Sequence, residues 1–226
     1  MAKKLTKAIP VKESTLIGFG TMREQLMETS VEVLFNHGGA KDLIIRKDAA
    51  EDLDKIVKSD RGDNRLRIIA HELMLMMDIK VDTKMIKIYC EGIEGSFMHH
   101  LWGCPGIHLG LLGKSIIRFG EYTIQYLIPD LDNKKLLTSI GPDAIINRTN
   151  LFCVGDLIYY FLTLILKREC KLNSDPDIRK KQRDELFDEL SRRVADQKRK
   201  VKEERNAKEK IASEKRIAKE LRKAKK

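Results

Sequence analysis

The chain has 226 residues, and its 44 Lys and Arg against 34 Asp and Glu give a formal net charge of +10. Hydrophobic residues make up 42% of it, which excludes a disordered chain and predicts a globular domain with a core of ordinary size. The four cysteines, Cys90, Cys104, Cys153 and Cys170, fit neither a CxxC metal site nor a disulfide framework, so we expect a reducing compartment.

The first half of the chain predicts helices separated by short strands. The N-terminus is basic, but no apolar segment of the kind required by a secretory signal follows it. Apolar spacing and turn residues then predict, in order, a helix over residues 22–35, a strand over 42–46, helices over 49–58 and 64–77, and a strand over 84–90. Residues 92–113 are rich in glycine and are expected to form loops, which often carry functional sites.

The second half predicts a strand over residues 122–128, a short helix over 131–139 and an apolar helix over 151–168. The apolar helix is interrupted by Asp156 and is shorter than the roughly 20 residues that a membrane crossing needs. We expect it to be buried in the domain, with docking on a membrane surface as the alternative. These elements together predict an α+β class, with a mixed globular domain over residues 1–173.

A second region, residues 174–226, predicts one long charged helix, basic from residue 191. Asp175 can cap it, Pro176 suits its first position, and Ser174 with Asp177 suits a capping box. No later residue stops the helix, so it would extend for about 75 Å. Four acid-to-base pairs at four-residue spacing favour it: Asp188 with Arg192, Glu189 with Arg193, Asp196 with Lys200, and Glu204 with Lys208.

The heptad pattern of this helix is short. Phe187, Leu190, Val194 and Val201 fit the apolar positions of a coiled coil, but the next positions are polar or charged. We therefore expect the helix to pack on the domain as far as Val194, anchored by Phe187 and Leu190, and to project beyond it.

All of the excess charge lies in this helix. Residues 191–226 hold 16 Lys or Arg and 6 Asp or Glu, which leaves 28 of each sign in the rest of the chain. This bias predicts a polyanionic partner, contacted through its phosphates because the segment has no aromatic residue with which to stack on bases. A purely solubilising face is the alternative. The candidate nucleic-acid-binding residues are Arg192, Arg193, Lys198, Arg199, Lys200, Lys202, Arg205, Lys208, Lys210, Lys215, Arg216, Lys219, Arg222, Lys223, Lys225 and Lys226.

Three segments contain incomplete motifs of catalytic or metal sites. His71-Glu72 begins like a zinc-protease HExxH helix, but position 75 is Leu. Residues 106–115 end in Gly113-Lys114-Ser115, as a phosphate-binding loop does, but His108 replaces the opening glycine. A loop also gathers potential zinc ligands, although its Gly103 and Pro105 disfavour a helical arrangement of them. Those ligands are His99, His100, Cys104 and His108. We predict no metal, no cofactor and no enzymatic activity.

The junction of the domain and the helix resembles a known family. Asp156-Leu157-Ile158-Tyr159-Tyr160, then Lys171-Leu172-Asn173, then a charged helix, resembles the C-terminal cytosolic part of calumin-type coiled-coil endoplasmic-reticulum proteins over residues 156–226. The resemblance implies a cytosolic domain at the protein-conducting channel, with its terminal helix on ribosomal RNA during membrane-protein biogenesis. The signal sequence, acidic luminal segment and membrane span of that family have no counterpart here.

The sequence thus predicts a non-enzymatic protein that binds structured RNA or the ribosome. We expect it in the cytoplasm, or peripherally at the endoplasmic-reticulum membrane, with the protein-conducting channel or another complex as a further partner. The alternative is a nucleocapsid-like or scaffold subunit, in which the basic helix neutralises nucleic acid or an acidic partner.

Overall fold

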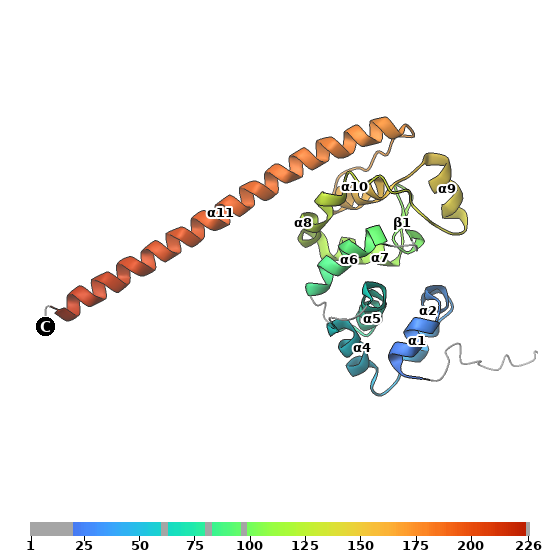
Figure 1. Ribbon diagram of the computed structural model, residues 1–226, viewed down its shortest axis with the longest axis horizontal. Coiled ribbons are helices and arrows are strands. Elements are labelled where there is room, and N and C mark those ends of the chain that lie inside the picture. The colour runs from blue at the N-terminus through green and yellow to red at the C-terminus, as the bar shows by residue number, and fades with distance from the viewer. Residues whose placement is uncertain (1–19, 60–62, 80–82, 96–98, 225–226) are drawn as a thin grey trace, which may run out of the picture. The chain divides into compact units, whose positions relative to one another are not determined.

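A computed structural model describes residues 20–59, 63–79, 83–95 and 99–224, with side chains as far as Glu209. The chain groups into two compact units, residues 1–92 and 93–226, and the boundary between them falls within helix α6, Lys84–Gly95. Most of the described residues are helical (Figure 1). The long C-terminal helix belongs to the same unit as the segment from residue 93 to 173. The division into a domain of residues 1–173 and a helix of residues 174–226 stays a prediction.

The first unit is built of short helices. They are α1 Met22–Glu28, α2 Val31–Asn36, α3 Gly39–Ile44, α4 Ala49–Lys58, α5 Asn64–Met76 and the first part of α6. α4 packs on α5, and α1 packs on both. Leu26, Leu53 and Leu73, one from each of these helices, are buried where they meet. The expected helices over 49–58 and 64–77 are confirmed, whereas the one over 22–35 is two helices, because Ser30 caps a new helix by accepting from the Val33 N–H.

The two strands expected in this unit are both wrong. Residues 42–46 lie largely in α3, whose buried Ala40 and Leu43 are three residues apart. Residues 84–90 lie in α6, where Met85, Tyr89 and Ile93 are buried at four-residue spacing. A short alternation of apolar and charged residues suggested a strand, but the burial pattern over the whole segment follows the helical period.

The second unit combines helices with a small hairpin. Its elements are η1 His99–Leu101, β1 Gly103–Cys104, β2 His108–Leu109, α7 Leu111–Phe119, η2 Gly120–Thr123, α8 Ile124–Leu127, η3 Ile128–Asp130, α9 Pro142–Asn150, α10 Val154–Ile165 and α11 Pro176–Ala224. β1 and β2 pair antiparallel, with Gly103 opposite Leu109 and Cys104 opposite His108. They form the one named sheet within the described residues. The strand content of the α+β prediction therefore reduces to this hairpin and one isolated bridge, Leu136 to Cys153.

Helix α10 is the core of this unit. Val154, Leu157 and Phe161 are completely buried, and the helix contacts α7, α8, η3 and α11 (Figure 1). The expectation that the apolar segment 151–168 forms a buried helix is confirmed. No helix in the described part of the chain is both long and apolar enough to cross a membrane.

The remaining predictions for this unit differ from the structure. The strand expected over residues 122–128 is helical, because Thr123, Ile124, Leu127 and Ile128 are buried in pairs four residues apart. The helix expected over 131–139 is wrong: the segment is a turn followed by residues without regular secondary structure, apart from the bridge at Leu136. α9 escaped prediction, because the residue that it buries is the polar Asn147, while its Ile145 is exposed. Its apolar spacing therefore gives no helical signal.

Candidate nucleic-acid interface

The long helix α11 starts where the sequence predicts. The Asp175 side chain accepts a hydrogen bond from the Asp177 N–H at 2.8 Å, and Pro176 takes the first helical position. Among the residues of α11 whose side chains are described, those buried are Arg179, Arg183, Leu186 and Leu190, at intervals of four, three and four. These intervals place them on one face of the helix. Two of the four are arginines, so the contact with the domain is as much ionic as apolar.

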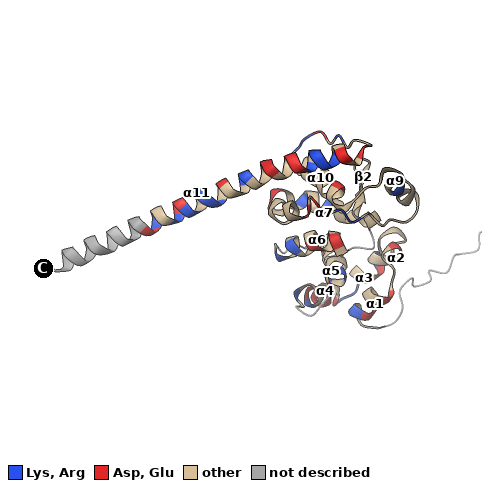
Figure 2. Cartoon of the chain, turned by 45° about the horizontal axis from the view of Figure 1, so that its top comes forward, with Lys and Arg blue, Asp and Glu red and all other residues tan. Residues whose placement is uncertain are grey.

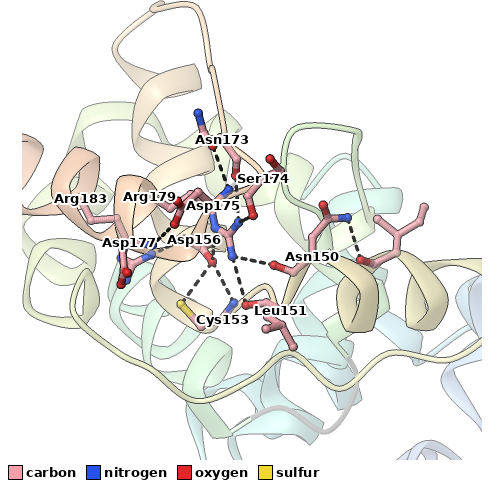
Figure 3. Close-up of polar contacts among 11 residues, drawn as sticks. Asn150, Leu151, Cys153, Asp156, Asn173, Ser174, Asp175, Asp177, Arg179 and Arg183 are labelled. Atoms are coloured by element: carbon pink, nitrogen blue, oxygen red, sulfur yellow. Dashed lines mark hydrogen bonds and ion pairs between the residues drawn. The ribbon is translucent and has the colours of Figure 1, made fainter.

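Asp156 of α10 receives both buried arginines (Figure 3). It stands at the third position of α10, where its Oδ2 also accepts the Cys153 N–H at 3.1 Å. Arg179 Nε donates to the same Oδ2 at 3.1 Å, and Arg183 Nη1 donates to Oδ1. A carboxylate in the first turn also lies near the positive end of the helix dipole. Asp156 is therefore the common acceptor of the two elements.

Arg179 has every donor engaged in the domain. Besides the Asp156 bond, Nη1 donates to the carbonyls of Asn173 and Ser174 at 2.8 and 2.9 Å, and Nη2 donates to those of Asn150 and Leu151 at 2.7 and 3.3 Å (Figure 3). The guanidinium also lies 5.0 Å from the centre of the Phe152 ring. Since a guanidinium has five N–H groups, nothing of Arg179 is left for a ligand. It fixes α11 to α10 and to the segment before it.

One predicted anchor is wrong, and three of the four buried residues were not predicted. Leu190 is 1% exposed, as expected, but Phe187 is 41% exposed and lies off the buried face. Leu186 occupies the position assigned to Phe187. Arg179 and Arg183 were overlooked because charged residues on a long helix are usually solvated. Their four-residue interval, continued by Leu186 and Leu190, was the available signal.

Beyond the anchored part the helix is exposed. Val194 is half-buried, and every residue from 195 to 209 is exposed, which confirms that packing on the domain fades at Val194. Figure 2 shows both basic and acidic residues along this part of α11, as far as its residues are described. We call residues 195–224 the projecting part of α11.

The candidate interface residues divide into three groups by how far the structure describes them. Those with exposed, described side chains are Arg192, Arg193, Lys198, Arg199, Lys200, Lys202, Arg205 and Lys208. Those for which only the helical backbone is described are Lys210, Lys215, Arg216, Lys219, Arg222 and Lys223. Lys225 and Lys226 lie outside the described residues. Along the described stretch the cations are not confined to one face of the helix.

The acid-to-base pairs on α11 differ from the predicted set. Glu189 binds Arg168, in the segment after α10, through two hydrogen bonds of 2.8 and 2.5 Å. This contact lowers the pKa of Glu189 and raises that of Arg168. Farther along, Asp196 pairs with Arg199 at 3.2 Å, and Glu209 with Arg205 at 2.8 Å. These exposed pairs leave the helix with an excess of positive charge.

The potential zinc ligands are not brought together. Both ring nitrogens of His99 are engaged, Nδ1 by the Thr138 N–H at 2.9 Å and Nε2 by the Ile93 carbonyl at 3.1 Å. Cys104 Sγ donates to Asn147 Oδ1, and burial raises the pKa of this thiol to about 11. His108 contacts Asp143 at 3.0 Å. Within the described residues no group of three or more His, Cys, Asp or Glu could hold a metal ion.

Residues of the other two motifs also take part in packing. Gly113 and Lys114 lie inside α7, and a Cβ at Gly113 would be 2.1 Å from the Trp102 carbonyl oxygen. The glycine thus allows close packing, and Ser115 beside it is buried. His71 and Glu72 both hydrogen-bond the buried Tyr89 hydroxyl, at 3.0 and 2.8 Å. Desolvation, and then the carboxylate of Glu72, raise the pKa of Tyr89.

In comparisons with known proteins, no family model, curated protein or solved structure matches this chain. The function must therefore be inferred from the geometry and charge of the second unit.

Proposed function

We propose that this protein is a non-enzymatic RNA-binding protein that contacts phosphates through α11. The observation that carries the proposal is the division of this helix at Val194. Before it, one face is buried on the domain, and the two arginines on that face, Arg179 and Arg183, are both paired with Asp156. After it, the described cations, as far as Lys208, are exposed on several faces of the helix.

A rigid rod of this kind suits the surface of a folded RNA. The 49 residues of α11 extend for about 73 Å at about 1.5 Å per residue. Such a rod can meet phosphates from several turns of an RNA helix. The anchored end supplies the orientation, because the Arg179 and Arg183 contacts hold the first turns on α10. Binding of this type depends strongly on salt and little on base sequence.

The ribosome is the RNA-bearing partner that we favour. The resemblance of residues 156–226 to calumin-type proteins supports it, since that resemblance implies a helix on ribosomal RNA at the protein-conducting channel. Asp156, the first residue of the resemblance, is also the residue that anchors α11.

The absence of enzymatic activity is part of the proposal. The side chains that most resembled catalytic or metal-binding groups have structural partners: His99 is bonded at both nitrogens, and His71 and Glu72 share Tyr89. Each of these residues is buried.

The test is binding of purified ribosomes and of a ribosomal RNA hairpin by the full chain, measured by sedimentation and by fluorescence anisotropy at several salt concentrations. Removing six cations of α11 by substitution with Gln should weaken binding and reduce the slope of log K against log salt, by about 0.7 to 0.9 for each phosphate that is no longer neutralised. The six are Lys198, Arg199, Lys200, Lys202, Arg205 and Lys208.

A matched control removes six exposed lysines of the first unit in the same way: Lys41, Lys47, Lys55, Lys58, Lys84 and Lys87. The control loses the same number of positive charges as the α11 variant. It should still bind RNA like the original chain, because the proposal assigns binding to the cations of α11 and not to the net charge of the protein. Equal loss of binding in both variants, or full binding by a chain that ends at Ser191, would refute the proposal. Light scattering with and without RNA separates it from the nucleocapsid-like or scaffold alternative, for which RNA should drive the chain into large assemblies.

A further inference from the structure

A groove runs between α11 and the segment formed by α7, η2 and α8. Its volume is about 900 Å³, and its lining is drawn entirely from the second unit. The apolar residues of α11 that line the groove are Leu190, Val194 and Val201, and the side chain of Val201 is 65% exposed. Tyr122, on the opposite wall, is 74% exposed. The groove therefore presents apolar side chains to solvent on both walls.

The groove is also strongly cationic. Four basic residues of α11, Arg193, Lys198, Lys202 and Arg205, line it, against one carboxylate, Glu121. Their intervals of five, four and three keep them beside the Val201 face of the helix. Arg205 pairs with Glu209, but the other three cations give the groove a net positive charge. A ligand that packs on the apolar walls and is attracted by the cations must be apolar on one face and must carry acidic residues beside that face.

Two segments of this chain, residues 1–19 and the projecting part of α11, do not meet that requirement. Residues 1–19 carry Lys3, Lys4, Lys7 and Lys12 against the single acid Glu13, so they would be repelled. The projecting part of α11 from a second copy is basic as well. A like-charged occupant would place cations opposite cations, which is unfavourable.

We propose that this groove binds an acidic amphipathic helix of a partner protein. The lining of α11 from Leu190 to Arg205 extends for about 23 Å, which is about four helical turns. A helix with apolar residues at intervals of three and four would lay that face on Val194, Val201 and Tyr122, and its Asp and Glu would meet Lys198 and Lys202. This is the helix-in-groove mode of recognition.

The apolar side chains favour a peptide over a nucleic acid. Unpaired bases are bound by stacking between several aromatic rings, whereas the one strongly exposed aromatic residue in the lining of this groove is Tyr122, and its α11 wall offers the aliphatic Val194 and Val201. Aliphatic side chains pack with Leu and Ile of a partner helix. The proposal is separate from RNA binding, which uses the cations on all faces of the projecting part.

The probe is a fluorescent synthetic peptide of 18 residues, with Leu at positions 3, 6, 7, 10, 13 and 14 and otherwise Glu and Ala. A second peptide has the same composition in an order that breaks the Leu face, and a third has Lys in place of Glu. Anisotropy with the full chain should show that the first peptide binds at least about tenfold more tightly than either of the others. Equal binding of the first two peptides would mean that only charge is recognised and would overturn the proposal.

Two sets of variants locate the site. Substituting Gln for Lys198, Lys202 and Arg205 should weaken peptide binding roughly tenfold. Substituting Gln for Arg192, Arg199 and Lys200, which project from the other side of α11, should change it less than about twofold. An equal effect of the two sets would refute the groove.

The apolar contact is tested by Val201→Gln with Tyr122→Gln, and the control is Ile178→Gln, because Ile178 is also exposed on α11 but does not line the groove. The double variant should lose peptide binding and the control should keep it. Both sets of cation variants should weaken binding of the ribosomal RNA hairpin similarly, so failure of RNA binding and failure of the groove are distinguishable. If the double variant instead loses binding of a single-stranded oligo(U) RNA and keeps that of the peptide, the groove is a nucleic-acid site and the proposal is wrong.

Discussion

Arg179 and Asp156 form an ion pair in which each side chain is 1% exposed, with Nε and Oδ2 separated by 3.1 Å. Arg179 lies in the first turn of the charged helix α11. Asp156 lies in the first turn of the core helix α10, 23 positions earlier in the chain. Burial of this pair requires many hydrogen bonds to offset the cost of removing both charges from water. The Arg179 donors and the Cys153 N–H supply them.

Asp156→Ala should destabilise the protein by about 3–5 kcal/mol, because it leaves two buried arginines without their shared carboxylate. Urea unfolding measures the destabilisation, and hydrogen exchange of residues 176–190 should accelerate as the start of α11 separates from α10. The control is Asp184→Ala, which removes only the exposed pair with Lys180. It should cost less than about 1 kcal/mol. Equal costs would show that the buried triad is not the anchor.

Gly155→Ala should be destabilising because the α10 backbone approaches another segment closely there. A Cβ would lie 2.3 Å from the Leu131 carbonyl oxygen and 3.1 Å from Arg183 Nε. Helix α10 would have to shift, at a cost of about 1–3 kcal/mol or more. Gly95→Ala, at the end of α6, meets nothing within 4 Å. It should be neutral or stabilising by up to about 1 kcal/mol in the same thermal or urea unfolding experiment.

His99 should make the stability fall in mild acid. Burial lowers its pKa from the ordinary value of 6.5, and nearby Lys135 and His100 act in the same direction, against the Ile93 and Thr138 carbonyls. The folded state therefore holds fewer protons than the unfolded state below that pH, and unfolding is favoured as the pH falls. The unfolding free energy should decrease from pH 6.5 toward pH 5. His99→Gln should flatten this decrease.

The cysteines should differ in reactivity. Cys90, Cys104 and Cys153 are buried and Cys170 is half-buried. Desolvation raises the pKa of Cys104 from 9.0 to about 11, with Asp143 adding to the effect, and the thiol rather than the thiolate is present at neutral pH. At pH 8 a disulfide reagent should label Cys170 first and the other three only on unfolding. Rapid labelling of Cys104 in the folded protein would contradict the structure.

The Cys104 shift also predicts a decrease of stability in base. Because the folded-state pKa exceeds the unfolded one, the contribution is present below about pH 9 and disappears as the pH rises toward 11. Unfolding measured over this range, with Cys104→Ala as the comparison, checks the sign.

Helices with strong end signals or a long apolar run were predictable. α4 and α5 have clear apolar spacing, and α11 has Asp175 and Pro176 at its start. Short segments such as residues 84–90 were mispredicted as strands, because seven residues of alternating character do not separate a strand from a helix that is buried on more than one face. For α9 the inward-facing residue is Asn147, held by Ser139 and Cys104, which no periodicity could indicate.

The candidate interface, too, could be predicted from the sequence only in part. Position and sign of the charge are properties of the sequence, and so is the fading of the apolar seam after Val194. The identity of the anchors is not: Arg179 and Arg183 are buried only because Asp156, in a different helix, is placed to receive them.

By itself the sequence determined a neutral body, a long basic helix and the point at which that helix stops packing, because charge and periodicity are local properties that each residue carries with it. Tertiary structure decided which residues hold the helix and which side of it faces a groove. Both depend on segments far apart in the chain, since the cost of burying an arginine is met only when a carboxylate and several carbonyls converge on it.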